Sequence, residues 1–400
     1  MNSGEDQNPL EDRFEFGQNW WDFVNTQLTP TRLATSRQKL LQLLNVADLQ
    51  GKTFLDIGSG SGLHSLAAWQ SGAAHVTSFD YDPQSVEATR RLHALAGSPE
   101  NWTIMPGDVL NVEFLSTLSL HDVVYSWGVL HHTGAMWDAI RNASQLLAQG
   151  GIFCIALYTL DAYVNPSADF WLAVKQRYNR AGTFERAAWE WWYFCRFCVL
   201  SDLKHRRNPF RRFHHYHQSR GMSQWTDIRD WLGGWPMEFA GILETRAFCR
   251  DQLGLNLAWM SSGEACTEYV FFRNSEESPA ETENTNIQHV LLPGPFRNLK
   301  KSAFSCQLPE LPEKASGTSS SQYSNWMLYQ DWQPMTFSNA KFSAVAGRGG
   351  GRYYCQGRKL VFSTLDGSNP NANGCHYRLC RRIGPPLSPP AHEISFSESK

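Results

Sequence analysis

The sequence predicts an α/β fold, in which a mostly parallel sheet with a helical insertion is followed by a small C-terminal β-rich module. Between about residues 50 and 160, apolar runs of strand length alternate with amphipathic helical patterns. That alternation is typical of a parallel sheet with helices on both faces. A glycine-rich turn separates the first strand from the first helix. From His289 onward, short apolar runs are separated by Gly, Pro, Asn and Ser, which is typical of β structure.

The glycine-rich turn has the composition of a nucleotide site. Residues 53–57 form an apolar run of strand length, and the segment from Leu63 to Trp69 has one apolar helical face. The glycines at 58, 60 and 62 allow a sharp bend and let a ligand approach where a Cβ would collide. The start of the helix offers unpaired backbone N–H groups. We therefore predict a strand–turn–helix nucleotide site here.

Three acidic residues indicate which nucleotide the turn would bind. The turn reads D-x-G-x-G-x-G, whereas a dinucleotide-binding turn reads G-x-G-x-x-G. Asp56, just before the turn, would repel a pyrophosphate but could hold a cationic amino-acid head group. Asp80 ends the second apolar run and is placed to bind ribose hydroxyls. Asp108 follows the third run, where a carboxylate could accept from an adenine amino group. An oxidoreductase or a purely structural turn is the alternative.

The other elements follow in order. Helices are expected at 18–26 and 31–44, ahead of the first strand, where they could cover a cofactor. Later helices should begin at Asp82-Pro83, a cap followed by Pro, and near Thr133. The further strands of the sheet are expected at residues 75–79, 102–105, 122–126 and 152–158.

Several motifs resemble class I S-adenosylmethionine-dependent methyltransferases. DVVYSWGVLHHT and LAQGGIFCIALY match the fourth- and fifth-strand patterns of the ubiquinone-biosynthesis O-methyltransferase-like group. FCRDQLGLNLAWM and ACTEYVFFRN look like the last antiparallel strand pair of that fold. The resemblance implies a Rossmann-like sheet of seven strands and S-adenosyl-L-methionine as the cofactor. The cofactor residues that it implies are Asp56, Gly58, Gly60, Gly62, Asp80, Tyr81, Asp108, Val109 and Trp127.

Residues 160–246 interrupt this resemblance and are expected to form a helical cap over the active site. The insertion is rich in Trp, Tyr, Phe, Arg and His, so it suits a cap with an apolar underside and a polar mouth. Arg211, Arg212 and His214 are the candidate substrate residues in it. His131 and His132, after the fourth strand, are the candidate catalytic bases; packing of the loop is their alternative role.

The resemblance implies O-methylation of a small molecule or glycan, with N- and C-methylation left open. A catalytically silent methyltransferase-like scaffold, whose β module mediates binding, is the alternative function. The basic run 204–220 could meet an anionic acceptor or single-stranded nucleic acid. We expect no nucleic-acid partner, because the net charge is −2 and no Asn-Pro-Pro-Tyr-type tetrapeptide follows the fourth strand. The oligomeric state is not predicted.

Metal binding is not expected. Cys195 and Cys198 have zinc-like spacing, but no second pair completes the set. Cys355, Cys375, His376 and Cys380 do not have a recognised spacing either. The nine cysteines are scattered, the N-terminus has no signal-peptide pattern, and no apolar run is long enough to span a membrane, so a cytoplasmic protein is expected.

Composition also predicts the domain boundaries. Residues 1–16 are expected to be a mobile tail, and 17–274 the methyltransferase domain with its cap. The acidic, polar segment 275–287 is expected to be a linker, 288–383 the β-rich module, and 384–400 a disordered tail. On this division, residues 1–278 should fold and bind cofactor without the rest.

Overall fold

The structure is a computed structural model of the chain, and it describes residues 16–163, 166–204, 224–262, 265–274, 287–308, 326–331, 333–338, 340–382 and 384–392. Strands and helices alternate in it after two N-terminal helices. The strands of the first sheet are β1 (Thr53–Ile57), β2 (His75–Asp80), β3 (Trp102–Pro106), β4 (His121–Trp127), β5 (Leu147–Tyr158), β6 (Leu255–Ser262) and β7 (Cys266–Arg273). The helices that surround the sheet are α1 (Gly17–Thr26), α2 (Pro30–Leu44), α3 (Leu63–Gln70), α4 (Pro83–Leu95), α5 (Val112–Leu115), α6 (Met136–Gln145) and α12 (Ile242–Leu253).

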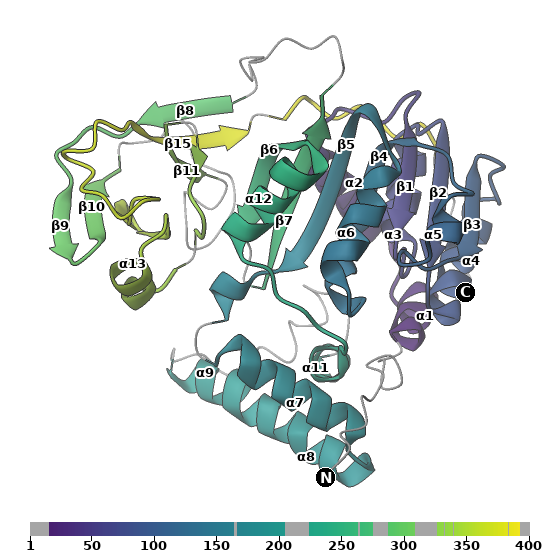
Figure 1. Cartoon of the computed structure of the whole chain (residues 1–400). Helices are drawn as coiled ribbons and strands as arrows, with labels where there is room; N and C mark the ends of the chain where they lie inside the picture. The colour runs from purple at the N-terminus through teal and green to yellow at the C-terminus, as the bar shows by residue number, and fades with distance from the viewer. Residues whose placement is uncertain are drawn as a thin grey trace, which may run out of the picture.

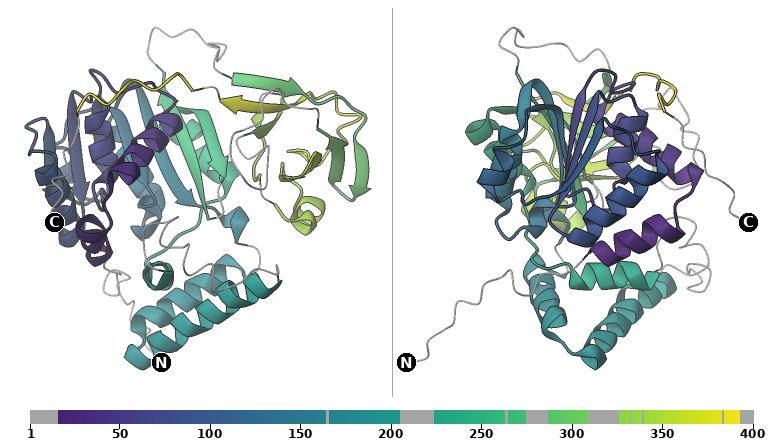
Figure 2. Two further views of the ribbon diagram at one scale, coloured as in Figure 1. Left: turned by 180° about the vertical axis from the view of Figure 1, so that it is seen from behind. Right: turned by 90° about the vertical axis from the view of Figure 1, so that its right-hand side faces the viewer.

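The first sheet has the strand order β3-β2-β1-β4-β5-β7-β6, and the fold predicted from the sequence is confirmed (Figure 1). β1 pairs in parallel with β2 and β4, while β7 runs antiparallel between β5 and β6. Helices cover both faces of the sheet (Figure 2). β5 begins earlier than expected: Leu147 pairs with His121, so α6 ends at Gln145, before Leu146 and Leu147.

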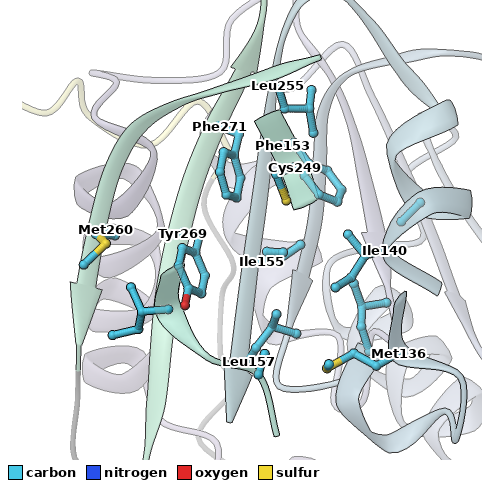
Figure 3. Packing of buried hydrophobic residues seen from close by; sticks show 14 of the residues in the cluster. Met136, Ile140, Phe153, Ile155, Leu157, Cys249, Leu255, Met260, Tyr269 and Phe271 are labelled. Atoms are coloured by element: carbon cyan, nitrogen blue, oxygen red, sulfur yellow. The ribbon is translucent and has the colours of Figure 1, made fainter. Parts of the chain in front are cut away.

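The core on one face of the sheet lies between β5, β7, α6 and α12. Met136 and Ile140 of α6 point toward Ile155 and Leu157 of β5 (Figure 3). These side chains are almost completely buried. Each buried aliphatic side chain contributes about 1.5–3 kcal/mol through loss of apolar surface to water. The packing fixes the carboxyl ends of β4 and β5, where ligands bind in open α/β sheets.

The insertion after β5 is mostly helical, as expected. Its described helices lie below the end toward which β5 points (Figure 1). They pack on one another through a second apolar cluster that contains Trp171, Val174, Tyr178, Ile228 and Leu232. We call residues 160–246 the cap. Its elements are η2 (Leu160–Ala162), α7 (Ala168–Arg180), α8 (Thr183–Tyr193), the π-helix η3 (Phe194–Val199), α9 (Leu200–Lys204) and α11 (Gln224–Gly233).

The C-terminal region contains two four-stranded antiparallel sheets, with orders β13-β14-β10-β9 and β12-β11-β15-β8. This matches the predicted β-rich module. A short helix, α13 (Phe342–Arg348), joins them in the fold although no helix of length was expected there. The strands are β8 (Ile287–Leu291), β9 (Arg297–Lys300), β10 (Ala303–Gln307), β11 (Met327–Gln330), β12 (Gln333–Pro334), β13 (Tyr353–Gln356), β14 (Lys359–Phe362) and β15 (Tyr377–Arg382).

The β-rich module shares apolar packing with the first sheet. One buried cluster includes Met260 and Tyr269 of β6 and β7 together with Met327 and Phe337 of the module. Arg246 of α12 donates to the Pro334 carbonyl at 2.9 Å, and Ser262 Oγ donates to the Thr336 carbonyl at 3.3 Å. Removing the module would expose this apolar surface, which weighs against independent folding of residues 1–278.

The segment 384–392 differs from the disordered tail expected for 384–400. It returns from the module to the far side of the first sheet, where Ser388 Oγ donates to Asp48 at 2.6 Å (Figure 1). Ala391 N–H donates to the Gln70 carbonyl at 2.7 Å. The Pro- and Ser-rich composition suggested disorder, but hydrogen bonds with Arg37, Asp48 and Gln70 hold the segment in place. We call residues 384–392 the strap.

Candidate cofactor and acceptor site

The turn between β1 and α3 has the backbone that its glycines predict. Gly58, Gly60 and Gly62 all have φ between +55° and +75°, which side chains with a Cβ rarely adopt. A Cβ on Gly58 would lie 2.4 Å from Val129 Cγ1, and one on Gly60 would lie 3.2 Å from Trp20 Nε1. The turn is therefore a close-fitting cradle between the end of β4 and α1, and it suits a nucleoside-containing cofactor.

Asp80 lies across this cradle at the end of β2. Its Oδ2 accepts from Gly60 N–H at 2.9 Å and its Oδ1 accepts from Asp82 N–H at 2.9 Å. Phe79, just before it, accepts from both Gly58 N–H and Ser59 N–H. The carboxylate thus stays beside the turn, at the strand end where ribose hydroxyls bind in related folds.

Asp56 is buried at the end of β1, with 3 % of its surface exposed. Ser65 Oγ donates to Asp56 Oδ2 at 2.5 Å, and a chain of hydrogen bonds continues through Ser78 to Trp102 Nε1. Burial raises the pKa of Asp56 to about 7, and the charge of Asp80 acts in the same direction. Asp56 therefore braces β1 against α3 and carries a proton that is readily lost near neutral pH.

The other residues of the predicted cofactor set differ in their exposure and contacts. Tyr81 is half exposed beside Asp80, and Asp108 accepts from Leu110 N–H at 2.8 Å. Val109 is a buried core residue. Trp127, 44 % exposed at the end of β4, donates from Nε1 to Glu268 of β7 at 2.8 Å. The structure brings Asp80, Tyr81 and Asp108 to one edge of the sheet, with Trp127 two strands away from β2.

Helix α1 joins the cradle to the cap. Trp20 lies over Gly60, Gly17 N–H donates to Asp82 at 2.8 Å, and the Asn19 amide donates to Asp230 of α11. Asp82 also caps α4 by accepting from Gln84 N–H. The N-terminal helix therefore covers the cofactor turn, as its position in the sequence suggested.

His131 and His132 are buried at the end of β4, and their hydrogen bonds define their protonation. His132 Nδ1 lies 2.7 Å from the Pro236 carbonyl, which can only accept, so Nδ1 carries the proton. Tyr158 N–H donates to His131 Nδ1 at 3.4 Å, which leaves the proton of the neutral ring on Nε2. Burial, reinforced by His132 and Lys175, lowers the pKa of His131 well below its usual value. His131 is therefore a hydrogen-bond donor at Nε2, which argues against the basic role suggested by the sequence.

Aromatic side chains of β5 and of the cap pack beside these histidines. The Tyr158 ring lies 4.2 Å from the His131 ring, and Tyr163 stacks on Trp231 with 7° between the ring planes. Phe239 packs against Tyr163 at 4.7 Å. We call these residues, together with Lys175, the acceptor cluster: His131, His132, Tyr158, Tyr163, Lys175, Trp231 and Phe239.

Sequence analysis named only His131 and His132 of this cluster, and the charged residue that it missed is Lys175. It lies on α7, is 1 % exposed, and donates to the Trp231 carbonyl. Its spacing in the sequence indicated burial. Lys175 follows Trp171 by four positions and precedes Tyr178 by three, so it lies on the apolar face of a helix. A lysine on such a face is usually dismissed as solvated.

Two further sets of candidates from the sequence are the basic residues of the insertion and the cysteines. Arg211, Arg212 and His214 lie outside the described residues. Cys195 is exposed, Cys198 is buried, and no group of three His, Cys, Asp or Glu side chains within the described ranges could hold a metal. Within the same ranges, no helix is both long and apolar enough to cross a bilayer.

Comparison with known proteins agrees with the geometry of the cradle. Residues 55–155 match the family model described as a methyltransferase domain. A tRNA U34 carboxymethyltransferase from Shewanella halifaxensis is 31 % identical over 121 residues, covering 30 % of this chain and 36 % of that protein. A ribosomal protein L11 methyltransferase from Photorhabdus laumondii is 28 % identical over 159 residues, or 37 % and 53 % of the two chains. The match to the carboxymethyltransferase thus spans about a third of that protein.

A magnesium protoporphyrin IX methyltransferase from Synechocystis, solved with bound S-adenosylhomocysteine, is 14 % identical. It aligns with 64 % of this chain and 94 % of its own, with a TM-score of 0.38. Residues 55–155 thus resemble a methyltransferase domain, and the cofactor is S-adenosyl-L-methionine. The narrower ubiquinone-biosynthesis group is not established by these relatives.

The relatives correct one expectation from the sequence. Nucleic acid was excluded as a partner on the basis of net charge and a missing tetrapeptide. The names of the curated relatives specify a tRNA uridine and a ribosomal protein, so that exclusion is wrong. Net charge over a whole chain does not describe the charge around one site, which is why it misled.

Proposed function

We propose that the chain transfers a methyl group from S-adenosyl-L-methionine to an oxygen atom of a planar acceptor, and that a nucleoside of RNA is the first class to test. The acceptor cluster carries this proposal. It brings four aromatic side chains and two histidines to the carboxyl ends of β4 and β5, next to the cofactor turn. Aromatic rings bind flat ligands by stacking, and unstacked RNA bases are recognised in this way.

The cofactor supplies an electrophilic methyl group. The chain's own residues bind the nucleoside part of the cofactor at the glycine turn and Asp80, and they cover it with Trp20. Val129 contacts the turn and His131 follows two residues later, so cofactor and acceptor regions are adjacent. The names of the tRNA-modifying relatives support RNA as the acceptor class.

A small molecule or glycan is the second candidate acceptor. It is favoured by the burial of His131 and Lys175, because a small ligand is enclosed more easily than a polymer. A silent scaffold is the third possibility, and the intact cradle weighs against it.

The test uses cofactor with an isotopically labelled methyl group. The full-length protein is incubated separately with bulk tRNA, a ribosomal protein fraction and a small-molecule extract that includes glycans. We expect label in the tRNA fraction, in a nucleoside identified by digestion and mass spectrometry. Label only in the extract would favour the second candidate. Binding of S-adenosylhomocysteine without transfer to any fraction would favour the scaffold.

A further inference from the structure

Lys175 is a buried amine that makes a hydrogen bond to a backbone carbonyl. Its Nζ donates to the carbonyl of Trp231, in the last turn of α11, and lies 4.2 Å from the centre of the Trp231 ring. An ammonium group has three donors and is rarely buried without an ion pair. The Trp231 carbonyl accounts for one of these donors, so the buried position of the amine needs a reason beyond capping a helix end.

Within the part of the chain that the structure describes, the surroundings of Lys175 come from four segments. His131 follows β4, Tyr158 ends β5, Tyr163 follows η2, and Asp230 precedes Trp231 on α11. Tyr158 contacts both the His131 ring, at 4.2 Å, and the Trp231 ring, at 5.7 Å, and so connects the amine to the histidines. Asp230 is the acid in this group, and it accepts from Asn19 of α1. Among the described residues, the acid of this enclosure is therefore Asp230, which also binds Asn19.

The same enclosure holds two buried donors without partners. Within the described residues, neither His131 Nε2 nor Trp231 Nε1 has a hydrogen-bond partner. Buried polar atoms are nearly always satisfied, so each exception needs an explanation, and a bound ligand that completes the network is one. Since both atoms are donors, the missing group is an acceptor, such as the oxygen of a carbonyl, a hydroxyl or an oxyanion.

We propose that Lys175 is the base that deprotonates the hydroxyl group of the methyl acceptor, and that His131 Nε2–H donates to the acceptor beside it. This proposal rests on the proposed function. The acceptor oxygen attacks the methyl carbon as its proton passes to the Lys175 amine. One C–O bond forms, one C–S bond breaks with its electron pair left on sulfur, and S-adenosylhomocysteine and the methyl ether are the products.

The acid–base properties agree with this division of roles. Burial lowers the pKa of Lys175 to about 7, and Asp230 opposes the shift only in part. A large fraction of the amine is then free at neutral pH, which is the condition for an efficient general base. His131 stays neutral, so it donates without competing for the proton. His132 donates to the Pro236 carbonyl and so positions the segment by which the chain leaves the cap.

The test compares Lys175→Met and Lys175→Arg with Asn179→Ala. Arginine keeps the charge and a donor for the Trp231 carbonyl but cannot act as a base near neutral pH. Asn179, one turn further along α7, donates to the Gly233 carbonyl at 2.7 Å, so its loss loosens the same end of α11 without removing an amine. S-adenosylhomocysteine affinity is measured by calorimetry in all three variants and the wild type.

We expect both Lys175 variants to lose about 100-fold or more in turnover on the fraction that the wild type methylates, with cofactor affinity within about twofold. The rise of wild-type turnover through about pH 7 should vanish in Lys175→Met. Asn179→Ala should retain both turnover and its pH profile. Normal turnover in either Lys175 variant would overturn the assignment.

A second measurement does not depend on turnover. Between pH 7 and 10.5 the unfolded chain keeps a proton on Lys175 that the native state has released, so wild-type stability rises with pH in that window. Lys175→Met should lack this contribution, and equal slopes would contradict a free amine. A wild type that methylates no fraction would overturn the proposed function and the base with it. An active wild type with an equally active Lys175→Met would overturn the base alone.

Discussion

The guanidinium of Arg352 in the C-terminal module donates to the carboxylate of Asp161, at the point where the chain leaves β5 for the cap. Both side chains are largely buried, at 15 % and 12 % exposure. Asp161 also accepts from Ile242 N–H at 3.3 Å, where the chain returns from the cap. A single carboxylate thus joins both ends of the insertion to the module. The module was expected from composition to be an accessory. Its Arg352 instead anchors the two ends of the cap through Asp161.

The first prediction concerns this ion pair. Arg352→Gln leaves a buried carboxylate without its charged partner, and removing one member of such a pair costs about 3 kcal/mol or more. We expect a lower melting temperature and faster amide hydrogen exchange in α11 and η2. Arg348→Gln, at an exposed position of α13, is the control and should change neither. Unchanged exchange in the cap would show that the module does not support it.

The second prediction concerns the ribose contact. Asp80→Ala removes a charge-assisted hydrogen bond to the cofactor, which is worth about 1.5–3 kcal/mol, or roughly 10- to 100-fold in affinity. Calorimetry with S-adenosylhomocysteine measures it. Glu87→Ala, an exposed acid of α4 that pairs with Arg90, is the matched control. If the two variants bind equally well, Asp80 does not contact the ribose.

The third prediction concerns pH and Asp56. The native pKa of about 7 lies above the ordinary value of 3.8, so between these values the native state holds a proton that the unfolded chain has lost. This group therefore makes stability fall as pH rises through that window, by at most about 1.4 kcal/mol per pH unit. Asp56→Asn keeps an acceptor for Ser65 and removes the titration.

Chemical denaturation of wild type and Asp56→Asn at pH 5, 6, 7 and 8 measures this effect. The difference in unfolding free energy should change with pH in favour of the variant, and it should level off above about pH 7. Parallel curves would mean that Asp56 is ionised throughout this range and that Ser65 compensates for its burial.

The sheet was predictable because its signals are local. Apolar runs, caps and glycines determine β1, the turn and α3 over fewer than 20 residues, and each agrees with its neighbours. Asp80 was predictable for the same reason, since its place at a strand end follows from the sequence. The burial of Asp56 by Ser65 and Trp102 was not, because those contacts join separate elements.

The acceptor cluster was only partly predictable. His131 and His132 follow a recognisable strand, but their protonation depends on Tyr158 N–H and the Pro236 carbonyl, which no spacing reveals. Lys175 appears in sequence as one polar residue on a helix. Its partner Trp231 is 56 positions away, so only the folded cap shows that the amine is enclosed.

The last prediction concerns the strap. Arg37 of α2 is buried and donates from Nη2 to the carbonyls of Ser388 and Pro389, at 2.7 and 3.3 Å. His392 stacks on Trp69 of α3 with the ring centres 4.3 Å apart. Both helices share a buried apolar cluster with Phe54 of β1.

Deletion of residues 384–400 would remove both acceptors from Arg37 and expose the Trp69 ring. A buried charged group without acceptors costs about 1–3 kcal/mol, so we expect a melting temperature lower by a few degrees and earlier protease cleavage near α2. Deletion of residues 393–400 alone, which keeps every one of these contacts, is the control and should match the full chain. Cofactor affinity should be similar in the two deletions, because Asp80 and the glycine turn do not contact the strap. Equal stability of the two deletions would show that the strap does not stabilise the fold. A loss of cofactor affinity confined to the longer deletion would show that the strap's contacts with α3 affect the glycine turn.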